Sequence, residues 1–166
     1  ESDRGLYDAV NKGIKLCSGT HYMVIGADDR LDPGAVQIVK SAIKANMDAD
    51  LIAFPVRKGS DVVVPRSNLP TWLAGQKTLV AEHAVGTVFR KSIHSLLGFY
   101  SNAFLVAADN EFVLRCYDYG SKIHYHESVL GEFALGGVSS REILITLLEN
   151  FRVQVKRGCF WVQLVL

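Results

Sequence analysis

The stretch HYMVIGADDRLDPG, from His21 to Gly34, carries an apolar run directly into two adjacent aspartates. The run follows Gly19 and predicts a buried strand over residues 21–27. Asp28 and Asp29 then stand side by side at the end of that strand, although like charges repel each other. Two interpretations are open at this point: the pair belongs to an ordinary loop and helix cap, or it binds something positively charged.

The residues after the aspartates predict a helix. Asp32 stands where an N-cap residue belongs and Pro33 at the first helical position, a strong helix-start signal. Apolar residues then recur three or four positions apart on one face, which consists of Val36, Val39, Ile43 and Met47.

Strands and helices alternate along the rest of the chain. A helical stripe of Leu6, Val10 and Ile14 precedes the opening stretch. A helix is predicted from about Asp109 to Gly120, which ends it. Further strands are predicted over residues 50–56, 61–65, 86–91 and 121–126. The alternation predicts an α/β fold with a mixed, mainly parallel sheet flanked by helices.

The C-terminal part is predicted to be a helix with an apolar tail. Ser139 and Glu142 have the spacing of a capping box. The buried face of the helix is predicted to consist of Ile143, Leu144, Leu147, Leu148 and Phe151. The tail GCFWVQLVL, residues 158–166, fits either a last strand or an association-prone end. We expect residues 1–140 and 141–166 to belong to one domain.

Composition and charge exclude several classes of protein. A net charge of +1 over 166 residues, with scattered basic residues, gives no sign of nucleic-acid binding. The three cysteines, Cys17, Cys116 and Cys159, are too widely spaced for a disulfide framework or a zinc site. They are interpreted as small buried hydrophobic residues in a reducing compartment. No run of about 18 apolar residues is present, so no transmembrane helix is predicted.

The position of the two aspartates favours a ligand site. In open α/β sheets, ligands bind beyond the carboxyl ends of the strands, which is where Asp28 and Asp29 fall. Carboxylate oxygens suit Mg²⁺ or Mn²⁺ that bridges a diphosphate. An Asp-Asp pair alone is a weak signal, because acidic loops between strands and helices are common.

Two ordered sets of residues strengthen that signal. The first set contains Glu1, Asp3, Gly5, Tyr7, Asp8, Ala9, Asn11, Lys12, Gly13, Gly19, Asp28 and Asp29. The second contains His83, Arg90, Gly98, Phe99, Asp109, Glu111, Gly136, Gly137 and Ser139. In order and spacing they resemble the family 2 glycosyltransferase domain, which has the GT-A fold. The resemblance covers about residues 1–140.

The resemblance implies roles for three aspartates. Asp29 would bind Mg²⁺ or Mn²⁺, and Asp28 would face the ribose or the sugar of a nucleotide-sugar donor. The metal would neutralise charge on the departing nucleoside diphosphate. Asp109 would be the catalytic base that deprotonates the acceptor hydroxyl for inverting attack on the anomeric carbon. The alternative for Asp109 is a helix N-cap.

Other candidate residues keep two interpretations each. Asp8 and Lys12 lie four apart, so they form either a surface ion pair or part of the donor pocket with Lys12 near the diphosphate. Glu111 is an alternative base or an acceptor contact. His83 is a candidate acceptor contact, although a histidine satisfied by ordinary hydrogen bonds is the more common case. Tyr100 fits core packing or stacking on a sugar.

The sequence departs from the family pattern in two places. The family usually has Asn where this chain has Gly26, which would loosen the pocket. The chain also begins late in the pattern: the first strands, which hold the nucleotide base, are expected to be missing. The exposed sheet edge that this leaves would favour self-association.

We therefore expect a partial GT-A domain of an inverting glycosyltransferase for polysaccharide biosynthesis. It would be cytoplasmic or at the inner face of the membrane, and peripheral membrane association stays open. Its partners would be a nucleotide-sugar donor and a glycan or lipid-linked acceptor. The rival interpretation is a non-catalytic remnant that binds glycans or assists assembly. A nucleotidyltransferase is disfavoured because no Gly-rich phosphate loop is present.

Overall fold

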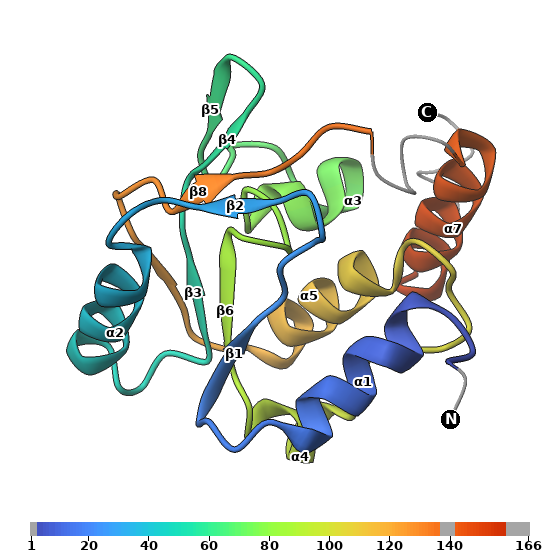
Figure 1. Cartoon of the computed structure of the whole chain (residues 1–166). Helices are drawn as coiled ribbons and strands as arrows, with labels where there is room; N and C mark the ends of the chain where they lie inside the picture. Colours follow the sequence, from blue (N-terminus) through green and yellow to red (C-terminus); the bar gives the residue numbers. More distant parts are fainter. Residues whose placement is uncertain (1–2, 137–141, 159–166) are drawn as a thin grey trace.

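The computed structural model describes residues 3–136 and 142–158. The helices are α1 (Leu6–Leu16), α2 (Ala35–Ala45), α3 (Thr71–Ala74), η1 (Gly75–Thr78), α4 (Ile93–Leu97), α5 (Ala108–Tyr119) and α7 (Ile143–Lys156) (Figure 1). The strands are β1 (His21–Met23), β2 (Arg30–Leu31), β3 (Leu51–Ala53), β4 (Val56–Lys58), β5 (Asp61–Val63), β6 (Thr87–Arg90), β7 (Ile123–Tyr125) and β8 (Gly131–Glu132).

The strands form two mixed sheets. The first has the order β1-β6-β3-β7 and the second the order β2-β8-β4-β5. In the first sheet β6 is antiparallel to both β1 and β3, whereas β7 is parallel to β3. Strands β1, β3 and β7 thus share one direction, and β6 runs against them. The predicted α/β class with mixed sheets is confirmed. Only one of the three strand pairings in the first sheet, β3 with β7, is parallel, so the expectation of a mainly parallel sheet is wrong. Helix–strand alternation does not reveal that β6 runs against both of its neighbours.

Strand β3 passes directly into β4 and so joins the two sheets. The predicted strand 50–56 is divided at Phe54 and Pro55. Phe54 N donates to Gly86 O at 2.8 Å, and Pro55 O accepts from Leu130 N at 3.0 Å. Proline has no N–H to donate, which interrupts the ladder at this point. All residues from Leu51 to Val56 are buried.

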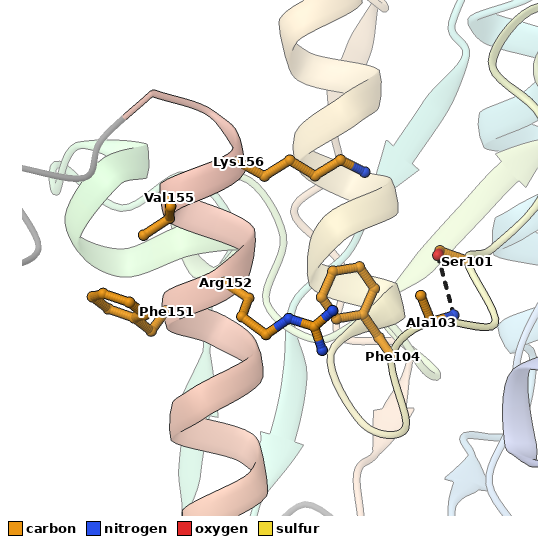
Figure 2. Close-up of a pocket in the computed structure, with 7 residues that line it drawn as sticks. All are labelled: Ser101, Ala103, Phe104, Phe151, Arg152, Val155 and Lys156. Carbon is orange, nitrogen blue, oxygen red and sulfur yellow. Dashed lines mark hydrogen bonds between the residues drawn. The ribbon is translucent and has the colours of Figure 1, made fainter.

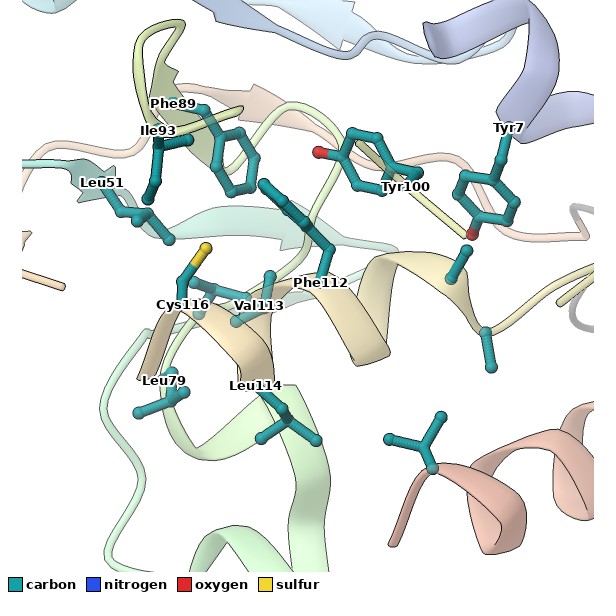
Figure 3. Close-up of a cluster of buried hydrophobic side chains, with 14 of the residues drawn as sticks. Tyr7, Leu51, Leu79, Phe89, Ile93, Tyr100, Phe112, Val113, Leu114 and Cys116 are labelled. Carbon is teal, nitrogen blue, oxygen red and sulfur yellow. The ribbon is translucent and has the colours of Figure 1, made fainter. Parts of the chain in front are cut away.

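Helices cover both faces of the first sheet. Leu51 and Phe89 pack with α1, α4 and α5 in a cluster rich in aromatic rings (Figure 3). Ile52 and Val88, which point to the opposite face, pack against α2. Helix α5 contributes Phe112, Val113, Leu114 and Cys116, each fully buried. It ends at Gly120 with φ 86°, the left-handed conformation expected of a helix-ending glycine.

The start of α2 differs from the prediction. Asp32 does not cap the helix. Its carboxylate forms a two-point ion pair with Arg57 of β4, with Arg57 Nη1 at 2.8 Å from Asp32 Oδ2. The N-cap residue is Gly34, which has φ 86°. A helix-start pattern is local, so it does not reveal that the fold places the Arg57 guanidinium beside Asp32. The predicted apolar face is also only half right, because Val36 and Met47 are 52% and 76% exposed.

Helix α7 docks with the face opposite to the predicted one. Four residues expected to be buried are exposed: Ile143, Leu144, Leu147 and Leu148. Phe151 is half-buried. The helix instead buries Glu149, Val153 and Gln154. The prediction of its buried face is therefore wrong.

Polar contacts explain this orientation of α7. The Glu149 carboxylate accepts the backbone N–H groups of residues 105–107 at 2.7–3.0 Å. Gln154 Nε2 donates to Thr71 O at 2.8 Å. A loop with three N–H groups needs an acceptor, and an apolar stripe cannot supply one. The predicted capping residue Ser139 and the apolar tail from Cys159 onward lie outside the described residues.

Candidate functional site

The two aspartates stand in a turn that follows β1. β1 ends at Met23, so the predicted strand 21–27 is too long, and its residues are half-buried rather than buried. Asp29 Oδ2 accepts the backbone N–H of Gly26 at 2.7 Å, and Asp29 Oδ1 accepts that of Ala134 at 2.9 Å. The Asp29 carboxylate thereby ties the turn to the segment after β8. Asp28 is exposed and has no hydrogen-bond partner among the described residues.

Gly26 is required by the position of Asp29. A Cβ atom at residue 26 would lie 2.8 Å from Asp29 Oδ2 and 3.2 Å from its Cγ. No side chain at position 26 fits while Asp29 keeps its hydrogen bond. Gly26 thus leaves room for the Asp29 carboxylate, and the expected loosening of the pocket at this position stays a prediction.

The donor chemistry of the turn fits a divalent cation. Within residues 3–136 and 142–158, no group of three or more His, Cys, Asp and Glu side chains could hold a metal ion. Asp28 and Asp29 together supply two hard carboxylate donors. Each oxygen of Asp29 accepts one N–H group and keeps a second lone pair. Mg²⁺ is typically bound by one or two carboxylates together with substrate phosphates and waters, which matches such a pair.

Asp109 lies in the first turn of α5. The N-cap residue is Ala107, so Asp109 is not the N-cap. Its Oδ2 accepts Gln76 Nε2 at 2.9 Å, and its Oδ1 accepts Asn110 N at 2.7 Å. The amino end of a helix carries partial positive charge and stabilises a carboxylate. Asp109 is thus a positioned acid, as a catalytic base must be.

Tyr7 and His83 stand within the electrostatic reach of Asp109. Burial raises the pKa of the Tyr7 hydroxyl, and the nearby Asp109 carboxylate raises it further. Burial lowers the pKa of His83, while Asp109 acts in the opposite direction. His83 is 6% exposed, and its Nε2 lies 2.7 Å from Tyr100 Oη. Asp109 thus acts electrostatically on Tyr7 and on His83, and the hydrogen bonds of Asp109 go to Gln76 and Asn110.

The sequence assigned no role to two of these residues. Tyr7 belongs to the matched motif without a predicted role, and Gln76 lies in η1, where the sequence predicts no site residue. The Tyr7 hydroxyl donates to Val106 O at 3.0 Å, which ties α1 to the start of α5. Tyr100 is 2% exposed, so it packs in the core and does not present a face for sugar stacking.

Asp8 and Lys12 form the ion pair that their spacing predicts. Lys12 Nζ lies 3.1 Å from Asp8 Oδ2 and 2.9 Å from Asp3 Oδ1. Asp8 also accepts the backbone N–H of Arg4 at 3.0 Å. These contacts lower the pKa of Asp8, chiefly through Arg4, and raise that of Lys12, chiefly through Asp3. The role of the pair in donor binding stays a prediction.

Glu111 belongs to the junction of α5 and α7. Its carboxylate lies 2.6 Å from Arg115 Nη2 and 3.6 Å from Lys156 Nζ. No hydrogen bond joins it to Asp109, Gln76 or His83 among the described residues. These ion pairs account for its burial, and its role as an acceptor contact stays a prediction.

Two hollows open on the surface away from these residues. One of about 390 Å³ lies between α7 and the segment 101–104. Figure 2 shows Arg152 extending from α7 to the ring of Phe104, with its guanidinium 5.2 Å from the ring centre. The other, of about 560 Å³, is lined by Ser18, Thr20, Lys91 and His94 among others. Neither is lined by Asp28, Asp29 or Asp109.

Comparisons with known proteins relate the chain to glycosyltransferases. No protein-family model matches it. It is 25% identical over 167 residues to a PGL/p-HBAD biosynthesis glycosyltransferase of Mycobacterium tuberculosis and to one of Mycobacterium bovis. These alignments cover 95% of this chain, which spans 62% of the length of each relative. The chain is thus homologous to glycosyltransferases over nearly its whole length.

Solved structures show the same fold. S. aureus TarS 1–349 in complex with UDP-GlcNAc superposes with a TM-score of 0.61 and 13% identity, covering 82% of this chain and 40% of that one. A second TarS structure gives a TM-score of 0.60 and 11% identity, over 90% of this chain and 30% of that one. No helix among the described residues is long and apolar enough to cross a membrane.

Proposed function

We propose that this chain carries the acceptor half and the metal-binding turn of an inverting, family 2 glycosyltransferase with the GT-A fold. It would move a sugar from a nucleotide-diphosphate donor to a hydroxyl of a glycan or lipid-linked acceptor. The observation that carries the proposal is the arrangement of Asp109. Its carboxylate accepts hydrogen bonds from Gln76 Nε2 at 2.9 Å and from the backbone N–H of Asn110 at 2.7 Å, in the first turn of α5. Homology to glycosyltransferases gives that arrangement its chemistry.

Asp109 would act as the base. A general base must be placed within reach of the proton and must be ionised when the acceptor binds. The hydrogen bond from Gln76 fixes one carboxylate oxygen, and the backbone N–H of Asn110 fixes the other. As the acceptor oxygen attacks the anomeric carbon, its proton would pass to Asp109. The bond from that carbon to the diphosphate breaks on the opposite face, which inverts the configuration.

The donor would lie against the turn of Asp28 and Asp29. TarS, which shares the fold, was solved with UDP-GlcNAc, and this supports a nucleotide sugar as donor. Asp28, exposed and unpaired among the described residues, would face the ribose or the sugar, and Asp29 would hold Mg²⁺ or Mn²⁺ through its remaining lone pairs. When bound, the cation would neutralise the negative charge that develops on the leaving diphosphate.

Calorimetric titration of UDP, and separately of GDP, in the presence of Mn²⁺ tests this donor site. We expect metal-dependent binding of one nucleotide by the wild-type chain and loss of binding in Asp29→Ala. Asp28→Asn should weaken binding without any effect on folding, because Asp28 supports no described contact. Asp61→Ala, an exposed aspartate on β5, is the matched control. A folded wild-type chain that binds neither nucleotide with Mn²⁺ would refute the donor site.

A further inference from the structure

Four side chains form an unbranched hydrogen-bonded chain through the aromatic core. His83 Nε2 lies 2.7 Å from Tyr100 Oη, and Tyr100 Oη lies 3.0 Å from Tyr22 Oη. Tyr22 Oη lies 2.8 Å from His94 Nε2, and His94 Nδ1 lies 2.9 Å from Gly98 O. We call His83, Tyr100, Tyr22 and His94 the relay. Figure 3 shows Tyr100 in this core with its hydroxyl pointing away from Tyr7.

The carbonyl at one end fixes the direction of every bond in the relay. Gly98 O can only accept, so His94 Nδ1 carries the proton. Nε2 of a neutral His94 is then bare and accepts the Tyr22 hydroxyl proton. Tyr22 has no second proton, so Tyr100 donates to Tyr22. Tyr100 is then the acceptor for His83, whose Nε2 must carry the proton.

Both histidines are neutral and both tyrosines are protonated under ordinary conditions. Burial lowers the pKa of His83 and of His94. It also raises the pKa of Tyr22 and of Tyr100. The charged groups around the ends act in the same sense for His94: Arg115 of α5 disfavours its protonation. Arg90 and Lys91 line the hollow that His94 also lines. Asp109 faces the His83 end.

We propose that the relay locks His83 in the tautomer with its proton on Nε2, so that the bare Nδ1 can accept a hydrogen bond from a second hydroxyl of the acceptor sugar, while Asp109 takes the proton of the attacking hydroxyl. Nδ1 of His83 has no hydrogen-bond partner among the described residues and is not among their fully buried unpaired atoms. A neutral imidazole nitrogen without a proton accepts a hydrogen bond from a hydroxyl group. Tyr22, Tyr100 and His94 are positioning residues, because they act through His83.

The relay acts as a lock rather than as a path for the reacting proton. If His83 Nδ1 took a proton and passed its Nε2 proton along the relay, Tyr100 and Tyr22 would each give up one proton and receive one. The charge would then appear on His94. On His94 the positive charge would be repelled by Arg115, whereas on His83 it would be attracted by Asp109. The orientation with a neutral His94 is therefore the stable one.

Long-range ¹H–¹⁵N NMR of the histidine rings at pH 7.5 tests the lock directly. We expect opposite tautomers: the proton on Nε2 in His83 and on Nδ1 in His94. Tyr22→Phe removes the hydroxyl that accepts the Tyr100 proton. The Tyr100 hydroxyl can then donate only to His83 Nε2 within the relay, so His83 should switch to the tautomer with its proton on Nδ1. Tyr125→Phe, a tyrosine outside the relay, should leave both rings unchanged. His83 with its proton on Nδ1 in the wild-type chain would overturn the proposal, even if Tyr22→Phe failed to fold.

The role of the free Nδ1 rests on the proposed function, and a second measurement separates the two. In sugar transfer, Tyr22→Phe should lower kcat/KM for the acceptor about tenfold, as expected for the loss of one hydrogen bond, and leave the affinity for Mn²⁺ and UDP unchanged. Opposite tautomers in a chain that transfers no sugar would refute the proposed function and leave the lock intact. Transfer by a wild-type chain whose His83 carries its proton on Nδ1 would refute only the lock.

Discussion

The carboxylate of Asp29 closes over the backbone of Gly26, whose N–H it accepts at 2.7 Å. A methyl group at residue 26 would stand 2.8 Å from the same oxygen. The turn that carries the two aspartates therefore depends on the absence of a side chain at this position. This relationship gives the first prediction.

Gly26→Ala should displace the Asp29 carboxylate and break its bond to Gly26. We expect a loss of about 1 kcal/mol in the free energy of unfolding, the usual worth of one hydrogen bond. Urea denaturation measures it. Gly13→Ala is the matched control: nothing lies within 4 Å of a Cβ there, inside α1. The free energy of unfolding of this control should rise by about 0.5–1 kcal/mol, because alanine has a higher helix propensity than glycine. A Gly26→Ala variant as stable as the wild type would contradict the tight turn.

Glu149→Gln should destabilise the protein by about 3 kcal/mol. The Glu149 carboxylate accepts three backbone N–H groups. The glutamine side chain would place its own NH₂ group, a donor, against at least one of these N–H donors. Leu147→Ser, on the exposed face of the same helix, should change stability by less than about 0.5 kcal/mol, because this leucine is 63% exposed. Chemical denaturation of both variants checks the orientation of α7. The reverse ranking of the two effects would show that the helix docks with its apolar face.

The ion pair of Asp32 and Arg57 should contribute to stability above about pH 4 and lose that contribution on acidification. The Arg57 guanidinium lowers the pKa of Asp32 below its usual value. A carboxyl whose pKa is lower in the folded state stabilises the fold above its unfolded pKa of about 3.9 and ceases to do so as pH falls through the folded value. Asp32→Asn should therefore be less stable than wild type at pH 7, with the gap closing near pH 3. A difference in urea midpoint between wild type and Asp32→Asn that stays constant with pH would contradict the stabilising role of the ion pair.

Cys116 should be inert toward alkylation in the folded protein. Burial raises the pKa of its thiol to about 12, and the side chain is fully buried. The thiolate is the reactive form, so almost none is present at pH 8. Peptide mapping after iodoacetamide treatment should find Cys116 modified only in denaturant. Rapid modification of Cys116 in the native chain would indicate that α5 opens far more readily than its packing implies.

Local patterns predicted the elements whose signals are local. The helix predicted from about Asp109 to Gly120 is marked by a local helical pattern that ends at a glycine, and the structure contains this helix. The signal for a strand over residues 50–56 was also local, although the structure divides this stretch between β3 and β4. The matched motif pointed to Asp109 and His83 as site residues, and their roles stay predictions.

Long-range polar contacts decided what the sequence could not show. Asp32 leaves its capping position for Arg57, 25 residues away. Glu149 meets the loop 105–107 more than 40 residues away, and this turns the apolar stripe of α7 outward. The relay joins Tyr22 to His94, 72 residues apart. None of these partners is marked by spacing or periodicity, because each depends on where the backbone brings a donor to an acceptor.

Release of UDP from a panel of UDP-sugars, with glycan acceptors and Mn²⁺, tests the central role of Asp109 most directly. Asp109→Asn should lower the rate at least about 100-fold while leaving the affinity for Mn²⁺ and UDP unchanged, since it removes the base and not the donor site. Asp118→Asn, at the other end of the same helix, should keep the wild-type rate. An Asp109→Asn variant as fast as the wild type, or a folded wild-type chain that releases no UDP from any donor, would contradict the account.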